Sequence, residues 1–293
     1  MKKIISVSII SLFILPLFLL GCSASSGKTD DGKIKVTASI SPIKEFTQMI
    51  GGDRVDVTSL VPDNVEPHDF EPKTGDYKNV VGQKLFIYNG LGMEPWIDDI
   101  KTQSEGTDTN FVDTSKNVNS IDTDGKVDPH VWLSLKQAKV QAANIRDALI
   151  SADPDGTDYY NQNYDEFEKK VDSLYSEYKA KFDSVSNKNF MTSHAAFAYL
   201  CRDFGLNQYY INDVFGEGEA TAKTYETLTN YAKSNHIKTI FSESGDTTKE
   251  AETLANEIGG DVKEIYTLET KPENLSYFDA IKFDLDEIYN SEN

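Results

Sequence analysis

The chain has 293 residues, with 48 acidic and 29 basic side chains, so its formal net charge is −19. This balance excludes a protein that binds nucleic acid or docks electrostatically on anionic lipid, because both need clustered basic side chains. Hydrophobic residues make up 39%, enough to fold one or two domains, and two cysteines are too few for a disulfide framework.

The first 22 residues have the pattern of a secretory signal. Lys2 and Lys3 precede an apolar run that ends in Leu-Leu-Gly-Cys at Cys22. A charged start, an apolar middle and a small residue before the cut predict secretion, and the ending resembles the lipobox of bacterial lipoproteins, whose cysteine carries lipid. An uncleaved membrane anchor is the alternative, but the run is short for a bilayer span. We expect a signal peptide over 1–21 and a protein outside the cytoplasm, anchored to the bacterial cell membrane by lipid on Cys22.

The next residues predict a tether and then an α/β lobe. Residues 22–32 are small and polar, as in flexible linkers. In the lobe, over 33–157, strands are predicted at 33–40, 55–61, 84–88 and 111–112. Helices are predicted from Ser41 (as cap) and Pro42 to Gly51-Gly52, at 76–81, at 94–102 and from the cap Ser134 to Asp153-Pro154. Residues 101–126 are polar and predict a surface loop around the last short strand.

Residues 158–185 predict one long amphipathic helix. Apolar side chains recur every three or four residues, from Tyr160 to Phe182, between charged and polar positions. The helix would be roughly 40 Å long, and it contains no Gly or Pro to mark a kink. A coiled coil is the alternative, but the seam lasts under four heptads and uses aromatic side chains rather than Leu and Ile.

The remaining residues, 186–293, repeat the alternation of strands and helices. Strands are predicted at 189–192, 208–211, 239–243 and 262–266. Helices are predicted at 195–204, 221–234, 247–258 and 276–290. The fold class is therefore α/β, with two lobes that each contain a mainly parallel sheet flanked by helices and are joined by one long helix.

Three of the four histidines lie where a predicted strand ends or a helix begins. These are His68, His130 and His194, whereas His236 lies at a helix-to-strand junction. Ligand crevices of open α/β sheets form at the carboxyl ends of the strands. Imidazole nitrogens together with a carboxylate suit a borderline divalent cation such as Zn²⁺.

A fourth ligand from the second half would complete such a site. Glu243 ends a predicted strand and Glu269 follows one, so both are candidates. Three histidines and one acid form a closed set, which favours holding a metal over activating water. We therefore do not expect an enzyme; a zinc hydrolase would need an open coordination position. Spacing alone leaves open the alternative that these histidines are surface residues or helix caps, because no compact motif such as His-Glu-x-x-His is present.

The motifs around these histidines resemble those of one protein family. The chain is similar, over essentially all of 33–293, to the zinc- and manganese-type substrate-binding lipoproteins of bacterial ABC importers (cluster A-I, or cluster 9). The resemblance is carried by Ile50-Gly51-Gly52-Asp53, residues 57–62, Glu66-Pro67-His68-Asp69-Phe70-Glu71-Pro72, residues 88–96, Asp128-Pro129-His130-Val131-Trp132-Leu133 and His194-Ala195-Ala196-Phe197.

The resemblance implies two lobes joined by a rigid helix, with one metal ion between them. Matched position by position, the ligands are His68, His130, His194 and Glu269, and Glu243 becomes a hydrogen-bonding acid. It also implies a cognate ABC permease as partner, and we expect a monomer. Zn²⁺ is favoured over Mn²⁺, because manganese members tend to offer two histidines and two acids and a third imidazole softens the site.

Two departures from the family pattern bear on the metal. Residues 101–126 contain no histidine, where many zinc importers carry a His-rich loop, and Ser134 stands where Asp is common. The missing loop weakens the zinc assignment without removing it. A manganese-specific protein of the same class and a surface adhesin remain the alternatives.

Overall fold

The computed structural model describes residues 32–123, 125–216, 221–244 and 249–292. The expected signal peptide, Cys22 and nearly all of the expected tether lie outside these ranges and stay predictions. Within the described ranges, no helix is both long enough and apolar enough to cross a bilayer.

The first lobe is built on a four-stranded parallel sheet, as the alternation of strands and helices predicted. Its spatial order is β2-β1-β3-β4. The strands are β1 (Ile34–Ala38), β2 (Val55–Ser59), β3 (Leu85–Tyr88) and β4 (Asn110–Asp113). All four residues of β3 are buried, as expected of a strand that is covered on both faces.

The helices of the first lobe occupy the predicted segments. They are α1 (Ser41–Gly51), α2 (Thr74–Val80), α3 (Ile97–Gln103) and α4 (Leu135–Ala152). Ser134 caps α4, accepting the N–H of Gln137. The predicted cap of α1 was wrong: Ser41 is its first residue, and Ile40 precedes it without a side-chain cap. Pro in the first turn has no N–H, so one fewer donor needs a cap there.

The predicted loop over 101–126 contains more structure than expected. Besides β4, it ends in a small antiparallel hairpin of β5 (Asp122–Thr123) and β6 (Lys126–Val127). Lys126 Nζ lies 2.7 Å from Oδ2 of Asp213, a residue of the second lobe. The hairpin therefore contacts the second lobe through this ion pair.

The second lobe repeats the architecture of the first. Its parallel sheet has the order β10-β9-β7-β8. The strands are β7 (Asn189–His194), β8 (Asn207–Asn212), β9 (Thr239–Glu243) and β10 (Asp261–Ile265). The helices are α6 (Ala198–Phe204), α7 (Ala222–Ser234), α8 (Lys249–Ile258) and α9 (Tyr277–Ser291).

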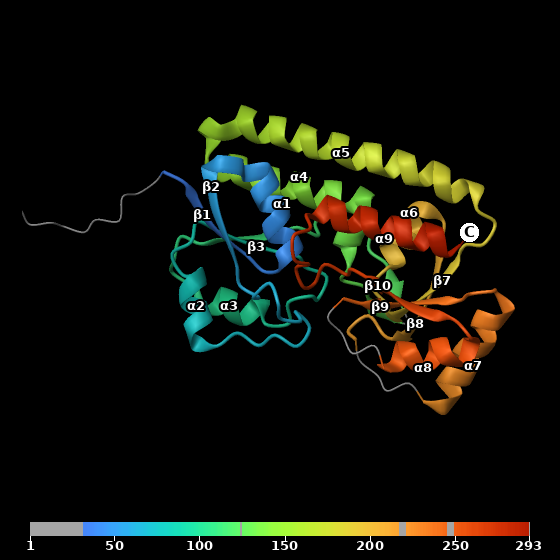
Figure 1. Cartoon of the computed structure of the whole chain (residues 1–293). Helices are drawn as coiled ribbons and strands as arrows, with labels where there is room; N and C mark the ends of the chain where they lie inside the picture. The colour runs from blue at the N-terminus through green and yellow to red at the C-terminus, as the bar shows by residue number, and fades with distance from the viewer. Residues whose placement is uncertain (1–31, 124, 217–220, 245–248, 293) are drawn as a thin grey trace, which may run out of the picture. The chain divides into compact units, whose positions relative to one another are not determined.

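The long predicted helix is α5 (Thr157–Ser184), which runs along both lobes (Figure 1). Its apolar stripe, which includes Tyr160, Phe167 and Phe182, is buried. The stripe packs against α1 and α4 of the first lobe and against α6 and α9 of the second. The apolar stripe is therefore buried against the helices of the two lobes and does not form a coiled coil.

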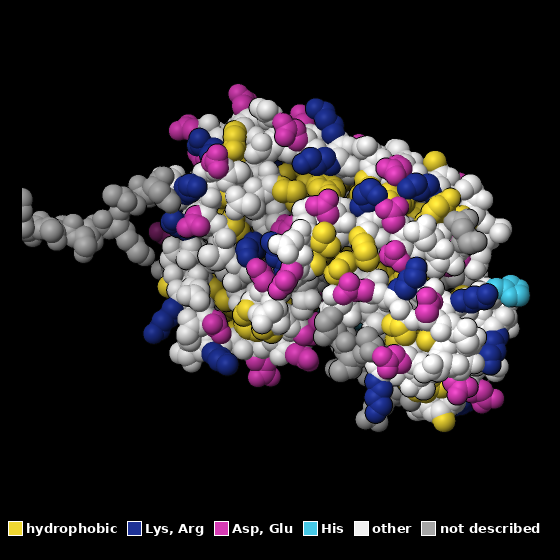
Figure 2. All heavy atoms as spheres, viewed as in Figure 1, with side chains coloured by type: hydrophobic (Ala, Val, Ile, Leu, Met, Phe, Trp, Pro, Cys, Tyr) yellow, Lys and Arg dark blue, Asp and Glu magenta, His cyan; other side chains and the backbone are white. Residues whose placement is uncertain are grey.

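The larger of two hydrophobic clusters in the described ranges is shared by both lobes. It runs from Phe46 on α1 through Phe167 on α5 to Tyr277 and Leu285 on α9, and a smaller cluster lies within the second lobe. The rings of Phe46 and Tyr277 are 4.7 Å apart, although 231 residues of sequence separate them. Outside the core, Figure 2 shows acidic and basic side chains spread over the visible face. The shared core disfavours a wide hinge movement between the lobes.

Candidate metal centre

The structure brings the four predicted ligands to the carboxyl ends of the strands. His68 lies between β2 and α2, His130 just before the turn that leads into α4, His194 at the end of β7, and Glu269 between β10 and α9. One nitrogen or oxygen atom from each lies within 4.8 Å of the others. His236 is exposed, at the start of the connection to β9. The sequence analysis therefore correctly set His236 apart from the three histidines that lie together in the cluster.

The distances between the side chains suit a small cation. Nε2 of His68 and Nε2 of His130 are 3.4 Å apart. Oε1 of Glu269 lies 2.8 Å from the first nitrogen and 3.1 Å from the second. Ligands about 2.05 Å from a tetrahedral Zn²⁺ lie about 3.3 Å from one another. For His68, His130 and Glu269, shifts of a few tenths of an ångström would give this spacing.

All four side chains are almost completely removed from solvent. The exposed fractions are 7% for His68, 0% for His130, 8% for His194 and 0% for Glu269. Nε2 of His194 and Oε2 of Glu269 have no hydrogen-bond partner among the described residues. Buried polar atoms are normally satisfied, so these two atoms indicate that a ligand belongs between them.

Carboxylates behind two of the histidines orient their rings. Asp128 Oδ1 accepts from Nδ1 of His130 at 2.8 Å, which turns Nε2 toward the cluster. Glu243 Oε2 lies 3.3 Å from Nδ1 of His194, and the other Glu243 oxygen accepts from the hydroxyl of Thr267. Such partners select the tautomer that presents Nε2 to a metal. Glu243 thus occupies the hydrogen-bonding place that the family resemblance implied.

The electrostatics of the metal-free cluster favour protonated imidazoles. Burial opposes a charge on His130, but Glu269 and Asp128 outweigh it and raise the pKa of His130 to about 10. Burial likewise opposes the charge on His194, while Glu269 and Glu243 raise its pKa. The pKa of Glu269 is lowered well below its usual value, against burial, by His130 and His194. A cation that enters must therefore displace protons.

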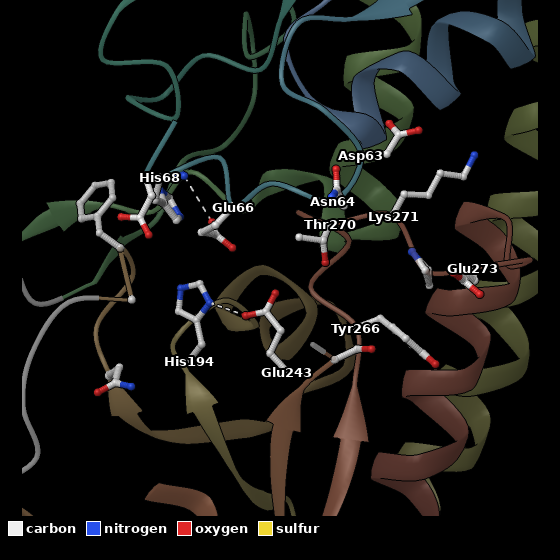
Figure 3. A pocket seen from close by; sticks show the side chains of 16 residues that line it. Asp63, Asn64, Glu66, His68, His194, Glu243, Tyr266, Thr270, Lys271 and Glu273 are labelled. Carbon is white, nitrogen blue, oxygen red and sulfur yellow. Dashed lines mark hydrogen bonds and ion pairs between the residues drawn. The ribbon is translucent and has the colours of Figure 1, made fainter. Parts of the chain in front are cut away.

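The cluster opens onto an acidic cavity of 610 Å³ between the lobes. In Figure 3, His68 and His194 project from opposite walls, with Glu66 and Glu243 beside them. Glu66, Glu243 and Glu269 also approach one another within 4.8 Å. Burial, then the charges of Glu269 and Glu243, raise the pKa of Glu66 to about 8. A cavity of this charge attracts cations.

Sequence reasoning missed three contributors to the centre. Asp128 and Glu66 were noticed only as letters of the motifs, although each stands two residues before a histidine ligand candidate. That spacing is the signal that could have found them. Phe215, whose ring centroid is 5.3 Å from that of His68, carries no comparable signal, because it comes from a separate loop after β8.

Comparison with known proteins agrees with this geometry. The family described as zinc-uptake complex component A, periplasmic (ZnuA), matches residues 36–291. The high-affinity zinc uptake system protein ZnuA of Bacillus subtilis is 32% identical over 99% of this chain and 98% of its own. The manganese ABC transporter substrate-binding lipoprotein PsaA of Streptococcus anginosus is 29% identical over 96% of each chain.

Solved structures give the same result. The laminin-binding protein Lmb of Streptococcus agalactiae, described as bifunctional with adhesin and metal-transporting activity, superposes with a TM-score of 0.85 at 29% identity. The match covers 89% of this chain and 100% of that one. The family match spans most of the chain and confirms the resemblance seen in the motifs. The chain therefore belongs to the ZnuA family, the metal-binding, substrate-binding proteins of ABC importers.

Proposed function

We propose that this protein captures Zn²⁺ outside the cytoplasm and delivers it to a cognate ABC permease. His68, His130, His194 and Glu269 are the proposed ligands. One observation carries the proposal: three imidazoles and one carboxylate converge within 4.8 Å at a buried point where two polar atoms lack partners among the described residues. Lipid on Cys22 would hold the protein beside its permease.

Zinc rather than manganese is proposed because of the donor set. Three nitrogen donors and one carboxylate suit Zn²⁺, whereas Mn²⁺ prefers oxygen donors. The zinc-uptake relative and the manganese relative both match over nearly the whole chain, so the family leaves the metal open. Glu66 and Glu243 add oxygen atoms nearby, and their recruitment is the route by which the manganese alternative would arise.

The proposed coordination has no place for hydrolytic chemistry. A catalytic zinc keeps a position for water beside three protein ligands. Here Glu269 would take the fourth position, since Oε1 already lies within 3.1 Å of two imidazole nitrogens. We therefore propose transport without catalysis, and hydrolysis of an ester or peptide that depends on zinc would contradict this part of the proposal.

Titration of the purified protein with zinc and with manganese tests the proposal. The chain is used without residues 1–31, since Gly32–Asn293 forms one compact unit. We expect one zinc ion per chain, bound more tightly than manganese, and strong losses in His68→Ala, His130→Ala and His194→Ala. His236→Ala is the matched control, because this histidine is exposed. Equal affinity in all four variants and the wild type would refute the site.

A further inference from the structure

The segment that carries Glu269 leaves the second lobe, yet hydrogen bonds on both sides of Glu269 lead to the first. Nε1 of Trp132 donates to the carbonyl oxygen of Thr267 at 2.8 Å. The backbone N–H of Lys271 donates to the carbonyl oxygen of Asp63 at 2.7 Å. These bonds lie two residues to either side of Glu269, so the first lobe holds its backbone from both directions.

The start of α9 continues the attachment. The hydroxyl of Tyr277 donates to the carbonyl oxygen of Trp132 at 2.7 Å, and the backbone N–H of Tyr277 donates to Oε2 of Glu45 on α1 at 2.9 Å. Trp132 thus donates to one end of the segment and accepts from the other. Its side chain is fully buried, so neither bond is exposed to competition from bulk water.

The side chain of Glu269, like its backbone, lies closer to the first lobe than to the second. Oε1 lies 2.8 Å from Nε2 of His68 and 3.1 Å from Nε2 of His130, both in the first lobe. Its approach to the second lobe is longer, 3.6 Å between Oε2 and Nδ1 of His194. The second lobe holds the segment at its beginning, through Ile265 in β10 and the contact of Thr267 with Glu243.

We infer that Trp132 is a positioning residue of the metal site, whose indole N–H docks the Glu269 segment onto the first lobe. His68, His130 and Glu269 then form one preorganised body, and His194 alone closes onto the metal from the other. Trp132 also packs edge-on against His130, with 5.4 Å between ring centroids. One side chain therefore sets the spacing of two ligands. The inference rests on the proposed function.

The bond lowers the entropy cost of metal binding, because it keeps the segment between the lobes ordered before the metal arrives. Without the indole bond, the segment after β10 must order itself each time a metal binds, which weakens the affinity. With the bond, three of the four donors are placed beforehand. A small opening of the cleft would then break the contact with His194 first and leave the metal on a three-donor face that is open toward the cavity.

Trp132→Phe tests the inference, because it keeps an apolar ring and removes the donor. Trp96→Phe is the matched control: Trp96 is also buried in the first lobe, but its Nε1 has no partner among the described residues. In zinc titrations of residues 32–293, we expect Trp132→Phe to weaken affinity on the order of 10- to 100-fold, as loss of a supporting bond does. Trp96→Phe should bind as the wild type does.

Double-mutant cycles separate positioning from a general loss of structure. In a Glu269→Ala background, Trp132→Phe should no longer change zinc affinity, because the ligand that the indole N–H positions is gone and the phenylalanine ring still packs against His130. In a His194→Ala background, its effect should persist. Thermal unfolding of the metal-free variants reports any structural loss independently of affinity.

The possible failures are distinguishable. A wild-type protein that binds neither zinc nor manganese refutes the proposed function and this inference together. A wild type that binds zinc, with Trp132→Phe equal to Trp96→Phe in affinity, overturns the inference alone. The inference is also overturned if Trp132→Phe costs as much affinity without Glu269 as with it, since Trp132 would then act through the general stability of the lobe.

Discussion

The carboxylate of Asp128 accepts from both the ring Nδ1 and the backbone N–H of His130, at 2.8 and 2.9 Å. One buried acid thereby determines the position of the loop and the orientation of the imidazole. Because Nδ1 donates to Asp128, Nε2 is the nitrogen that faces the cluster and is left to bind a metal once its proton is displaced. The Asp-Pro-His motif places the acid two residues before the histidine, and this spacing allows Asp128 to accept both hydrogen bonds.

Asp128→Asn should weaken zinc binding on the order of 10- to 100-fold. The amide can still accept from the ring, but a neutral partner makes the imidazole a poorer donor to the metal. Asp172→Asn is the control, because that carboxylate is 60% exposed and pairs with Lys139 on the surface. Competition with a zinc chelator measures both variants, and equal affinities would show that the charge of Asp128 is irrelevant.

A buried acid in the first lobe predicts a pH dependence of stability. Burial raises the pKa of Glu94 to about 7, although Ser39 and the N–H groups of Asn89 and Gly90 donate to it. The unfolded chain ionises near 4.5, so the folded state loses stability as the pH rises from 4.5 to 7. The loss is about 3 kcal/mol.

Glu94→Gln should remove that dependence, because the amide mimics the protonated acid. The difference in free energy of unfolding between variant and wild type should grow as pH rises from 4.5 to 7, whereas Glu257→Gln, at an exposed position, should show no trend. Urea titrations across this range measure it. Parallel curves for wild type and Glu94→Gln would mean that folding leaves the pKa of Glu94 unchanged.

The ion pair of Lys126 with Asp213 joins the hairpin of the first lobe to the second lobe. Asp213→Asn should accelerate zinc release about 1.5- to 5-fold, as expected for a partly exposed pair. Asp56→Asn, which removes a pair within the first lobe, is the control. Stopped-flow release into a chelator measures the rates. The acceleration should shrink in high salt; an effect that salt leaves unchanged would point to a cause other than this pair.

Phe182 on α5 tests whether the long helix contributes stability rather than binding. Its ring is fully buried and packs against Tyr178, Phe204 and Tyr289. Phe182→Ala should lower the free energy of unfolding by about 3–5 kcal/mol and leave zinc affinity within about twofold of the wild type. A larger loss of affinity than of stability would mean that α5 controls the geometry of the cleft.

Most elements of this fold could be predicted from local patterns. The stripe from Tyr160 to Phe182 predicted α5 to within one residue at each end, because its side chains must repeat with the helical period to meet one surface. The hairpin of β5 and β6 escaped prediction, since two-residue strands have no periodicity. The cap of α1 was misplaced because Pro42 changes what the first turn requires.

The residue types of the proposed site could also be inferred from the sequence, since few imidazoles occur and three lie where a predicted strand ends or a helix begins. The choice between Glu243 and Glu269 could not be made from position alone, because Glu243 ends one strand and Glu269 follows the neighbouring one. The tertiary structure gives them different partners. Glu243 lies beside Nδ1 of His194, whereas Glu269 lies beside Nε2 of two histidines of the other lobe. Around Glu269, Trp132 donates a hydrogen bond to Thr267 and Asp63 accepts one from Lys271, and these first-lobe residues are over a hundred residues away in sequence and have no local pattern.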